Sequence, residues 1–297
     1  LDMLHKYADR GQARILAVML NKEGLGPCRF VEAMNTWYGR PRIPVGRALR
    51  EFPSNEGMPN FTNIVPEMKA ADGTPLYPHT ISKLADCPDA VTLYRRLLAK
   101  QKDHSVTIVS VGFSGNLAAL LHTGADRYSP LSGAELVARK VSALVIMAGH
   151  IENPDYVEYN VENDIPSCQE VFAKWPGEIV VTPFELGLAA KLPASCLKND
   201  FGWTDHHPAL DAVMAARGQY ADYPTWDMTA VVYAVEGCAG YFTLSRPGTI
   251  TVTDKGCTHY QADSRGRHRY MMSDHNQSAL LVKHMCDLVS RKPKNKK

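Results

Sequence analysis

Residues 224–235, PTWDMTAVVYAV, place an aspartate directly after a tryptophan and ahead of an apolar run. The apolar residues between Ala230 and Val235 recur at helical spacing, so the pattern predicts a helix with Asp227 at its start. There Asp227 would serve as the N-cap, whose side-chain oxygen accepts backbone amide hydrogens. A carboxylate in this position can also hold a cation, because calcium and magnesium prefer oxygen ligands. The local pattern favours the cap and leaves the ligand interpretation open.

A second candidate site is the pair Glu158 and Asn160, which precedes a predicted helix start at residues 163–166. In an extended chain, side chains two residues apart face the same side. A carboxylate and an amide on one face suit two hydrogen bonds to neighbouring hydroxyls of a sugar. An exposed polar loop explains the same spacing. Asn21, which follows a predicted strand, has the same two interpretations.

A serine nucleophile is the third candidate. Ser114 lies in the sequence GFSGN between a predicted strand and a predicted helix, where an esterase places its nucleophile. The nucleophile elbow requires glycine two residues after the serine, and this chain has Asn116, so a tight turn is the favoured interpretation. The glycines of residues 24–26 do not make a dinucleotide loop, since Arg29 replaces the third glycine and Pro27 removes an amide donor.

Alternating apolar and amphipathic segments must position these residues. Buried strands separated by helices indicate an α/β fold: a mostly parallel, Rossmann-like open sheet with helices on both faces. In such sheets ligands bind beyond the carboxyl ends of the strands, where this chain has Asn21, Gly112, Gly149 and Glu185. The apolar runs predict strands at residues 15–20, 106–112, 143–149 and 179–185, helices at 28–38 and 116–122, and a hairpin of 241–245 with 248–253.

Length and composition favour a single domain of residues 1–297, with a surface excursion or lid at 50–89 and a frayed basic tail at 291–297. A net charge of +2 argues against a nucleic-acid partner, and no apolar run reaches the roughly 18 residues of a membrane span. Seven cysteines without a CxxC pair fit reduced thiols better than a zinc module. The chain starts at Leu1 without Met or a signal peptide, so we expect a processed protein or a piece of a longer one, located in the cytoplasm.

Several stretches, in order along nearly the whole chain, resemble the inosine–uridine-preferring nucleoside hydrolases, calcium-dependent enzymes that cleave the N-ribosidic bond. The matching stretches are MLHKYADRGQARILAV (3–18), VEAMNTWYGRPRIPVG (31–46), VTIVSVGFSGNLAALL (106–121), VSALVIMAG (141–149), VEYNVENDIPSCQEVFAKWPGEIVVTPFELG (157–187) and PTWDMTAVVYAV (224–235). The resemblance implies hydrolysis of ribonucleosides to ribose and free base in nucleoside salvage, with Ca²⁺ as cofactor. It also implies a small-molecule nucleoside substrate and a homodimer or homotetramer.

The resemblance also implies a role for each matching position. Asp227 would be a catalytic residue and a calcium ligand, and the backbone carbonyl of Val111 a second calcium ligand. Glu158 and Asn160 would bind the ribose, with Asn21 and Met147 lining the sugar pocket. The implied mechanism is dissociative: the base departs from an oxocarbenium-like ribosyl group, calcium holds two ribose hydroxyls and a water, and an aspartate takes the proton of that water.

Two departures from the family pattern affect function. The family has an aspartate cluster, D-x-D-x-x-x-D-D, just ahead of the helix that here begins at Leu1, and this chain lacks it. Asp2 falls where the family usually has an apolar residue. A catalytically inactive relative is therefore the alternative to an enzyme. The family also has a histidine before the metal aspartate to protonate the departing base, and here Trp226 stands instead. Tryptophan can stack on a nucleobase but cannot act as the acid, so another group must supply the proton.

Overall fold

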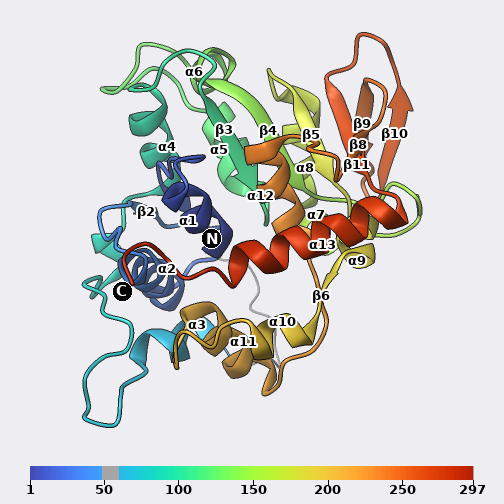
Figure 1. Cartoon of the computed structure of the whole chain (residues 1–297). Coiled ribbons are helices and arrows are strands. Elements are labelled where there is room, and N and C mark those ends of the chain that lie inside the picture. The colour runs from blue at the N-terminus through green and yellow to red at the C-terminus, as the bar shows by residue number, and fades with distance from the viewer. Residues whose placement is uncertain (49–59, 297) are drawn as a thin grey trace. The chain divides into compact units, whose positions relative to one another are not determined.

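The computed structural model describes residues 1–48 and 60–296, so part of the predicted excursion at 50–89 lies outside the described residues. Contacts divide the chain into two compact units, each made of discontinuous segments (Figure 1). Unit 1 comprises Leu1–Ala90, Leu192–Tyr223 and Lys283–Lys297, and unit 2 comprises Val91–Lys191 and Pro224–Val282. Each unit is described by itself, and a single domain of residues 1–297 stays a prediction.

Unit 2 contains a seven-stranded sheet, and its central part is parallel. The strand order is β10-β9-β11-β5-β4-β3, with β8 paired to β11. The pairs β3–β4, β4–β5 and β5–β11 are parallel, whereas β8, β9 and β10 join in antiparallel pairs. The strands are β3 (Val106–Ser110), β4 (Val141–Met147), β5 (Ile179–Thr182), β8 (Thr243–Leu244), β9 (Gly248–Val252), β10 (Thr258–Ala262) and β11 (His268–Met272). This arrangement confirms the predicted mostly parallel α/β sheet.

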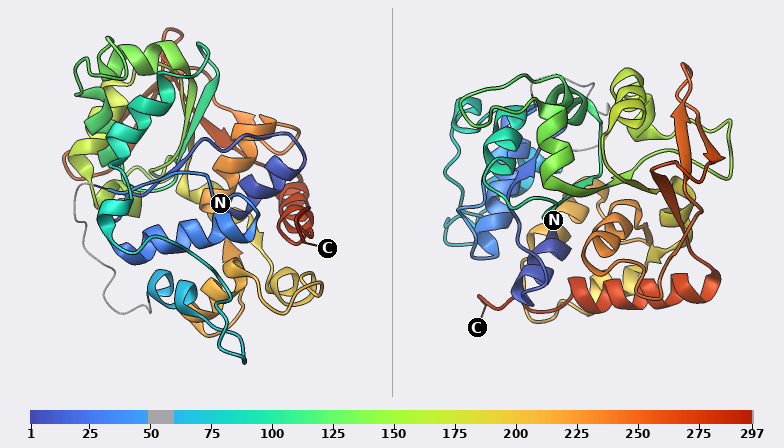
Figure 2. Two further views of the ribbon diagram at one scale, coloured as in Figure 1. Left: turned by 90° about the vertical axis from the view of Figure 1, so that its left-hand side faces the viewer. Right: turned by 90° about the horizontal axis from the view of Figure 1, so that it is seen from above.

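Helices cover both faces of this sheet. Figure 2 shows α5 (Gly115–Leu121), α6 (Gly133–Lys140) and α8 (Ile165–Lys174) on one face and α12 (Trp226–Glu236) on the other. Helix α12 packs against β3, β4 and β5, and all four residues of β5 are buried. A strand covered on both faces has no solvent side, which explains why β5 reads as a continuous apolar run. Two short helices, α7 (Tyr159–Glu162) and α9 (Phe184–Ala189), follow β4 and β5.

The strand registers bring the carboxyl ends of three strands to one edge. Ser110 of β3 pairs with Ile146 of β4, and Met147 of β4 pairs with Thr182 of β5. Gly149 turns the chain away from β4 with φ of +75°, and a Cβ there would lie 2.6 Å from the side chain of Thr258. Only glycine fits this turn, because it adopts positive φ without strain and has no Cβ to collide with Thr258. The loop that follows therefore begins at a fixed point on the sheet edge.

Three local predictions were wrong. Residues 15–20 form only a two-residue strand, and the fourth predicted strand ends at Thr182, so that Glu185 lies in the first turn of α9. The predicted hairpin of residues 241–245 with 248–253 does not form: β8 pairs with β11, and β9 pairs with β10. Alternation identifies a strand with one exposed face but not its partner, because several strands can satisfy the same pattern.

Unit 1 is mainly helical. A core cluster that includes Trp37, Tyr38, Val65 and Tyr77 joins α2 to the helices that follow it. Its elements are α1 (Asp2–Asp9), β1 (Val18–Met19), α2 (Leu25–Trp37), β2 (Val45–Gly46), α3 (Phe61–Ile64), η1 (Val65–Glu67), η2 (Leu84–Asp86), α10 (Ala194–Asn199) and α11 (Pro208–Arg217). Four elements contain a boundary between the units: α4 (Ala90–Leu98), β6 (Lys191–Leu192), β7 (Tyr223–Pro224) and α13 (His275–Val289).

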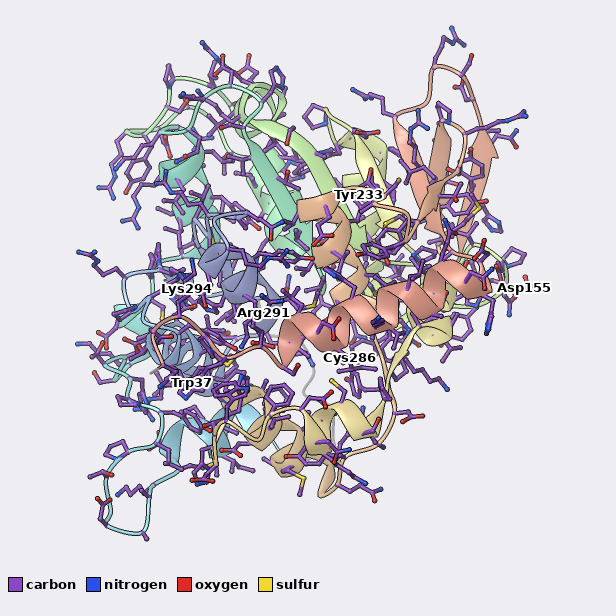
Figure 3. The ribbon with its side chains drawn as sticks, in the orientation of Figure 1. Trp37, Asp155, Tyr233, Cys286, Arg291 and Lys294 are labelled. Atoms are coloured by element: carbon purple, nitrogen blue, oxygen red, sulfur yellow. The ribbon has the colours of Figure 1, made fainter. Side chains whose placement is uncertain are left out.

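The basic tail is held against unit 1 over its described part, residues 291–296, which corrects the prediction of a frayed tail. Lys294 donates its backbone amide to Asp9 Oδ2 at 3.0 Å, and the Asn295 side chain donates to the carbonyl of Trp37 at 2.9 Å. Lys296 Nζ lies 4.5 Å from the centroid of the Trp37 ring. Figure 3 labels Trp37 and two residues of the tail, Arg291 and Lys294. A cation over an aromatic face is attracted by the ring quadrupole. The basic tail, which its sequence suggests is solvated, therefore contacts α2 instead.

Candidate active site

The turn that follows β4 holds Glu158 and Asn160 through hydrogen bonds. Glu158 is the N-cap of α7: its Oε1 accepts the amide hydrogen of Asn160 at 3.0 Å, and its Oε2 accepts that of Gly149 at 3.2 Å. The two residues therefore come together at a helix start and not in an extended chain, which corrects the predicted geometry. A capping carboxylate satisfies amide groups that the helix itself leaves unpaired.

Asn160 is fixed against the end of β4 in a way that leaves an acceptor open. Its Nδ2 donates to the carbonyl oxygen of Met147 at 3.2 Å and to the sulfur of the same residue at 3.0 Å. Among the described residues no donor is found for Asn160 Oδ1. Since a fixed amide with an unoccupied acceptor can receive a hydrogen bond from a ligand hydroxyl, this side chain is suited to bind a sugar. Three predicted site residues, Met147, Glu158 and Asn160, thus lie in one contact network.

Glu158 is 2% exposed, and this burial raises its pKa to about 7. Desolvation is the main cause, because a buried site disfavours the charged carboxylate. The amide hydrogens of Asn160 and Gly149 oppose the shift, and the negative charge of Asp227 adds to it. Asp227 is therefore near enough to Glu158 for the two charges to interact. This makes Asp227 the fourth predicted site residue at this edge of the sheet, after Met147, Glu158 and Asn160.

Asp227 lies in the first turn of α12 but does not cap it. The helix begins at Trp226, and Thr225 occupies the N-cap position, so the predicted cap was placed two residues too late. The Thr225 hydroxyl donates to the carbonyl of Ala190 at 2.5 Å, which fixes the start of the helix on the segment after β5. Asp227 is exposed, and the protein around it raises its pKa to about 6 by desolvation. Asp227 thus lies at the surface of unit 2, while the protein atoms around its carboxylate partly desolvate it.

Trp226 is fixed by its neighbours at the start of α12. Its indole nitrogen donates to the carbonyl oxygen of Phe184 at 3.0 Å, and its ring stacks on that of Phe184 with centroids 5.3 Å apart. The Phe184 ring in turn lies 5.6 Å from His150 and 4.9 Å from Tyr156. An aromatic wall of Trp226, Phe184, His150 and Tyr156 therefore extends from α12 to the loop after β4. Planar aromatic surfaces of this kind suit the stacking of a flat ligand.

Val111 and Asn21 differ in how the structure places them. Val111 directly follows β3, at the same edge of the sheet as Met147, because β3 and β4 pair up to Ser110 and Ile146. Asn21 follows β1 in unit 1, whereas the other predicted site residues belong to unit 2. The roles of both residues stay predictions.

The described residues do not meet the requirements of a calcium ion. Calcium takes roughly six to eight oxygen ligands, usually with several carboxylates. In the described part of the chain no group of three or more His, Cys, Asp or Glu side chains could hold a metal. Asp227 and the carbonyl of Val111 would supply two oxygens between them. We therefore derive no chemical step through a metal.

Sequence reasoning missed the His150 side chain and the role of Glu185. Glu185 appeared only as a polar residue near a strand end, and nothing in the sequence linked it to a histidine 35 positions earlier. The two side chains meet because β4 and β5 are adjacent and parallel, which places the segments that follow both strands side by side. The one signal in the sequence was that ionisable residues, His150 and Glu185, follow two consecutive predicted strands.

Ser114 does not fit the esterase alternative. It stands at the N-cap of α5 and is 2% exposed, with the thiol of Cys168 as a hydrogen-bond neighbour. A nucleophilic serine must reach its substrate and be activated by a base. The favoured interpretation of a tight turn agrees with this burial.

Unit 2 is an α/β unit with a mostly parallel sheet covered by helices on both faces. A family model described as inosine–uridine preferring nucleoside hydrolase matches residues 28–288. The protein belongs to this family. None of the helices in the described part of the chain has the length and apolarity of a membrane span.

Solved structures show the same fold at low sequence identity. A plant nucleoside hydrolase is 20% identical with a TM-score of 0.65, over 98% of this chain and 95% of that chain. An inosine–guanosine nucleoside hydrolase is 14% identical with a TM-score of 0.71, with the same shares covered. The inosine–uridine preferring nucleoside hydrolase of Bacillus anthracis is 14% identical with a TM-score of 0.63, over 97% of this chain and 95% of that chain. A comparison with curated proteins gives no match.

Proposed function

We propose that the protein hydrolyses the N-glycosidic bond of ribonucleosides at the carboxyl edge of the unit 2 sheet. The observation that carries the proposal is the turn in which Glu158 and Asn160 are locked against Met147. Both side chains are held by backbone groups, so little side-chain freedom is lost when a sugar binds. The free acceptor Asn160 Oδ1 is available to a ribose hydroxyl, and the Glu158 carboxylate lies beside it.

The base-binding part of the site would be the aromatic wall that includes Trp226. A nucleobase stacked there would be aligned by a ring whose indole N–H is already bonded to Phe184. A fixed ring binds at lower entropic cost than a mobile one. Which nucleoside is preferred depends on groups that contact the edges of the base, and we propose only the ribonucleoside class.

Asp227 is the proposed general base for the attacking water. It is exposed, it interacts with Glu158, and its pKa of about 6 lies near the pH at which a base must be both ionised and able to accept a proton. The negative charges of this edge would also stabilise an oxocarbenium-like ribosyl group as the base departs. This assignment requires no metal.

Calcium dependence is retained as a separate hypothesis, which rests on the resemblance alone. The small number of oxygen ligands in the described residues favours a second candidate function, a protein that binds nucleosides without hydrolysing them. The two functions differ in turnover and not in binding. The implied homodimer or homotetramer is likewise a hypothesis about the family.

The test is a ribose-release assay of the full-length native protein with inosine, uridine and p-nitrophenyl riboside, each with and without EDTA. Turnover that EDTA abolishes supports calcium assistance, and turnover that EDTA leaves unchanged supports the metal-free assignment. If none of the three substrates releases ribose, the hydrolase proposal is wrong. Thermal stabilisation by inosine without turnover would then identify the binding function.

A further inference from the structure

A histidine and a glutamate form a half-buried pair at the carboxyl edge of the unit 2 sheet. His150 Nδ1 lies 3.1 Å from Glu185 Oε2, and the two side chains are 13% and 16% exposed. Glu185 Oε1 accepts the amide hydrogens of Ile151 and Glu152, each at 3.0 Å. Those two bonds fix the carboxylate with its second oxygen directed at the imidazole ring.

That second oxygen, Glu185 Oε2, is buried and has no hydrogen-bond donor among the described residues. The reason is that His150 Nδ1 accepts the amide hydrogen of Asn153 at 3.0 Å, so the nitrogen that faces the carboxylate carries no hydrogen in this state. A buried acceptor without a donor carries a free-energy cost, because it has lost its hydrogen bonds to water. A hydrogen on Nδ1 would remove that cost and would release the exposed Asn153 amide to water. The pair is therefore built to accommodate an imidazolium as well as a neutral ring.

The ring lies within the candidate active site. Gly149, the residue before His150, donates its amide hydrogen to Glu158, the predicted ribose-binding carboxylate. The His150 ring also stacks on Phe184, which stacks on Trp226. The backbone of His150 is fixed in addition, since its amide donates to Thr258 Oγ1 at 3.0 Å and its carbonyl accepts from the same hydroxyl at 3.1 Å.

Other histidines of unit 2 stand elsewhere. His104 and His268 lie at the amino ends of β3 and β11, which is the opposite edge of the sheet. His122 ends α5 and pairs with Glu170. His259 belongs to the outer strand β10, and His275 begins α13. In unit 2, His150 is the only histidine on the loop after β4, where the amide of Gly149 donates to Glu158.

We propose that His150 is the general acid that protonates the departing nucleobase, with Glu185 as the residue that positions it. This inference rests on the proposed function. In the reactive state Nδ1–H donates to Glu185 Oε2 and Nε2–H faces the substrate. As the bond between ribose C1′ and the base nitrogen breaks, its electron pair goes to the base, which takes the Nε2 proton. Water adds its oxygen to C1′ and loses a proton, which passes to solvent, and solvent restores the proton of His150.

The test uses two substrates whose leaving groups differ in their need for a proton. Hypoxanthine leaves inosine readily only when protonated, whereas p-nitrophenolate leaves p-nitrophenyl riboside without a proton. General acid catalysis typically contributes about 10²–10⁴-fold. In the full-length protein, His150→Gln should therefore lower kcat on inosine by about 10²-fold or more and leave kcat on p-nitrophenyl riboside near the wild-type value.

His122→Gln is the matched control, because His122 also faces a glutamate, at 2.6 Å, but lies outside the site with 63% of its side chain exposed. It should leave both rates unchanged. Retained activity on p-nitrophenyl riboside also shows that the His150→Gln protein is folded. Equal losses on both substrates, or no loss on inosine, would overturn the assignment of the acid. A wild-type protein that cleaves neither substrate would instead refute the proposed function on which the inference rests.

Glu185→Gln tests the positioning role separately. The glutamine carbonyl can still accept the amides of Ile151 and Glu152, while its NH₂ group faces Nδ1 and holds the ring neutral. The expected result is a fall in kcat on inosine with KM unchanged and with p-nitrophenyl riboside unaffected. The alkaline limb of the inosine pH profile, where the acid loses its proton, should also move relative to wild type. An unchanged inosine profile would show that Glu185 does not position the acid.

Discussion

The side-chain amide of Asn160 donates to both the carbonyl oxygen and the sulfur of Met147, at 3.2 Å and 3.0 Å. This double contact joins the turn after β4 to the last residue of the strand. It also orients the amide so that its NH₂ group faces the protein and its oxygen is left for a ligand. A residue that the sequence marked as a candidate for sugar binding is thereby fixed in one orientation.

Replacing Asn160 should weaken substrate binding more than it weakens the fold. Asn160→Ala removes the free acceptor, and the loss of one such hydrogen bond costs about 1 kcal/mol, so KM for inosine should rise about fivefold to tenfold. Steady-state kinetics measures the change. Asn163→Ala is the matched control on the same helix, since Asn163, the C-cap of α7, donates to the carbonyl of Tyr159 at 2.8 Å. Equal KM values for both variants would contradict the ribose-binding role.

Burial of Glu158 should make stability fall as the pH rises. Its pKa is raised from 4.5 to about 7, so between these values the folded protein keeps a proton that the unfolded chain has released. Folding then takes up a proton, and the free energy of unfolding decreases from about pH 4.5 to about pH 7. Urea unfolding at several pH values should show a flatter dependence in Glu158→Gln. An identical slope in the variant would show that Glu158 does not carry this proton.

Asp227→Asn should abolish turnover while the fold is retained. The variant keeps the size of the side chain but cannot accept a proton from water, so kcat should fall by about 10²–10⁴-fold. Asp205→Asn, an exposed aspartate of unit 1, is the matched control for the same substitution. If calcium is bound through Asp227, calorimetry with Ca²⁺ should show weaker binding in Asp227→Asn. Full activity of this variant would remove Asp227 from the mechanism.

Gly187→Ala should displace Trp226. A Cβ at Gly187 would lie 2.4 Å from the Trp226 Cα and 2.5 Å from its Cδ1, and the Gly187 carbonyl also accepts the amide of Thr225 at 3.0 Å. Backbone must move to relieve this contact, which should cost about 1–3 kcal/mol of stability and raise KM for inosine. Gly177→Ala is the control, because its Cβ would meet nothing closer than 3.7 Å. Thermal unfolding of the two variants gives the comparison.

The strands of the parallel sheet were the most predictable part of the fold. Strand β5 is buried at all four residues, which requires apolar or small side chains throughout, whereas β3 and β4 each have an exposed polar residue, Thr107 and Ser142, near the amino end. Boundaries were harder, because the segment ending at Glu185 remains compatible with a strand until Pro183 and the start of α9 interrupt it. The pairing of β8 with β11 depended on long-range contacts that alternation does not encode.

The sequence by itself determined the α/β class, the residue types at the ends of β3 and β4, and the family to which Asp227, Glu158 and Asn160 pointed. Those features are local, because they depend on side-chain periodicity and on short motifs. The tertiary structure decided that Thr225 and not Asp227 stands at the N-cap position of α12, and that Glu158 caps α7 while interacting with Asp227. It also brought His150 to Glu185, since only the parallel pairing of β4 and β5 makes neighbours of residues so far apart in the chain.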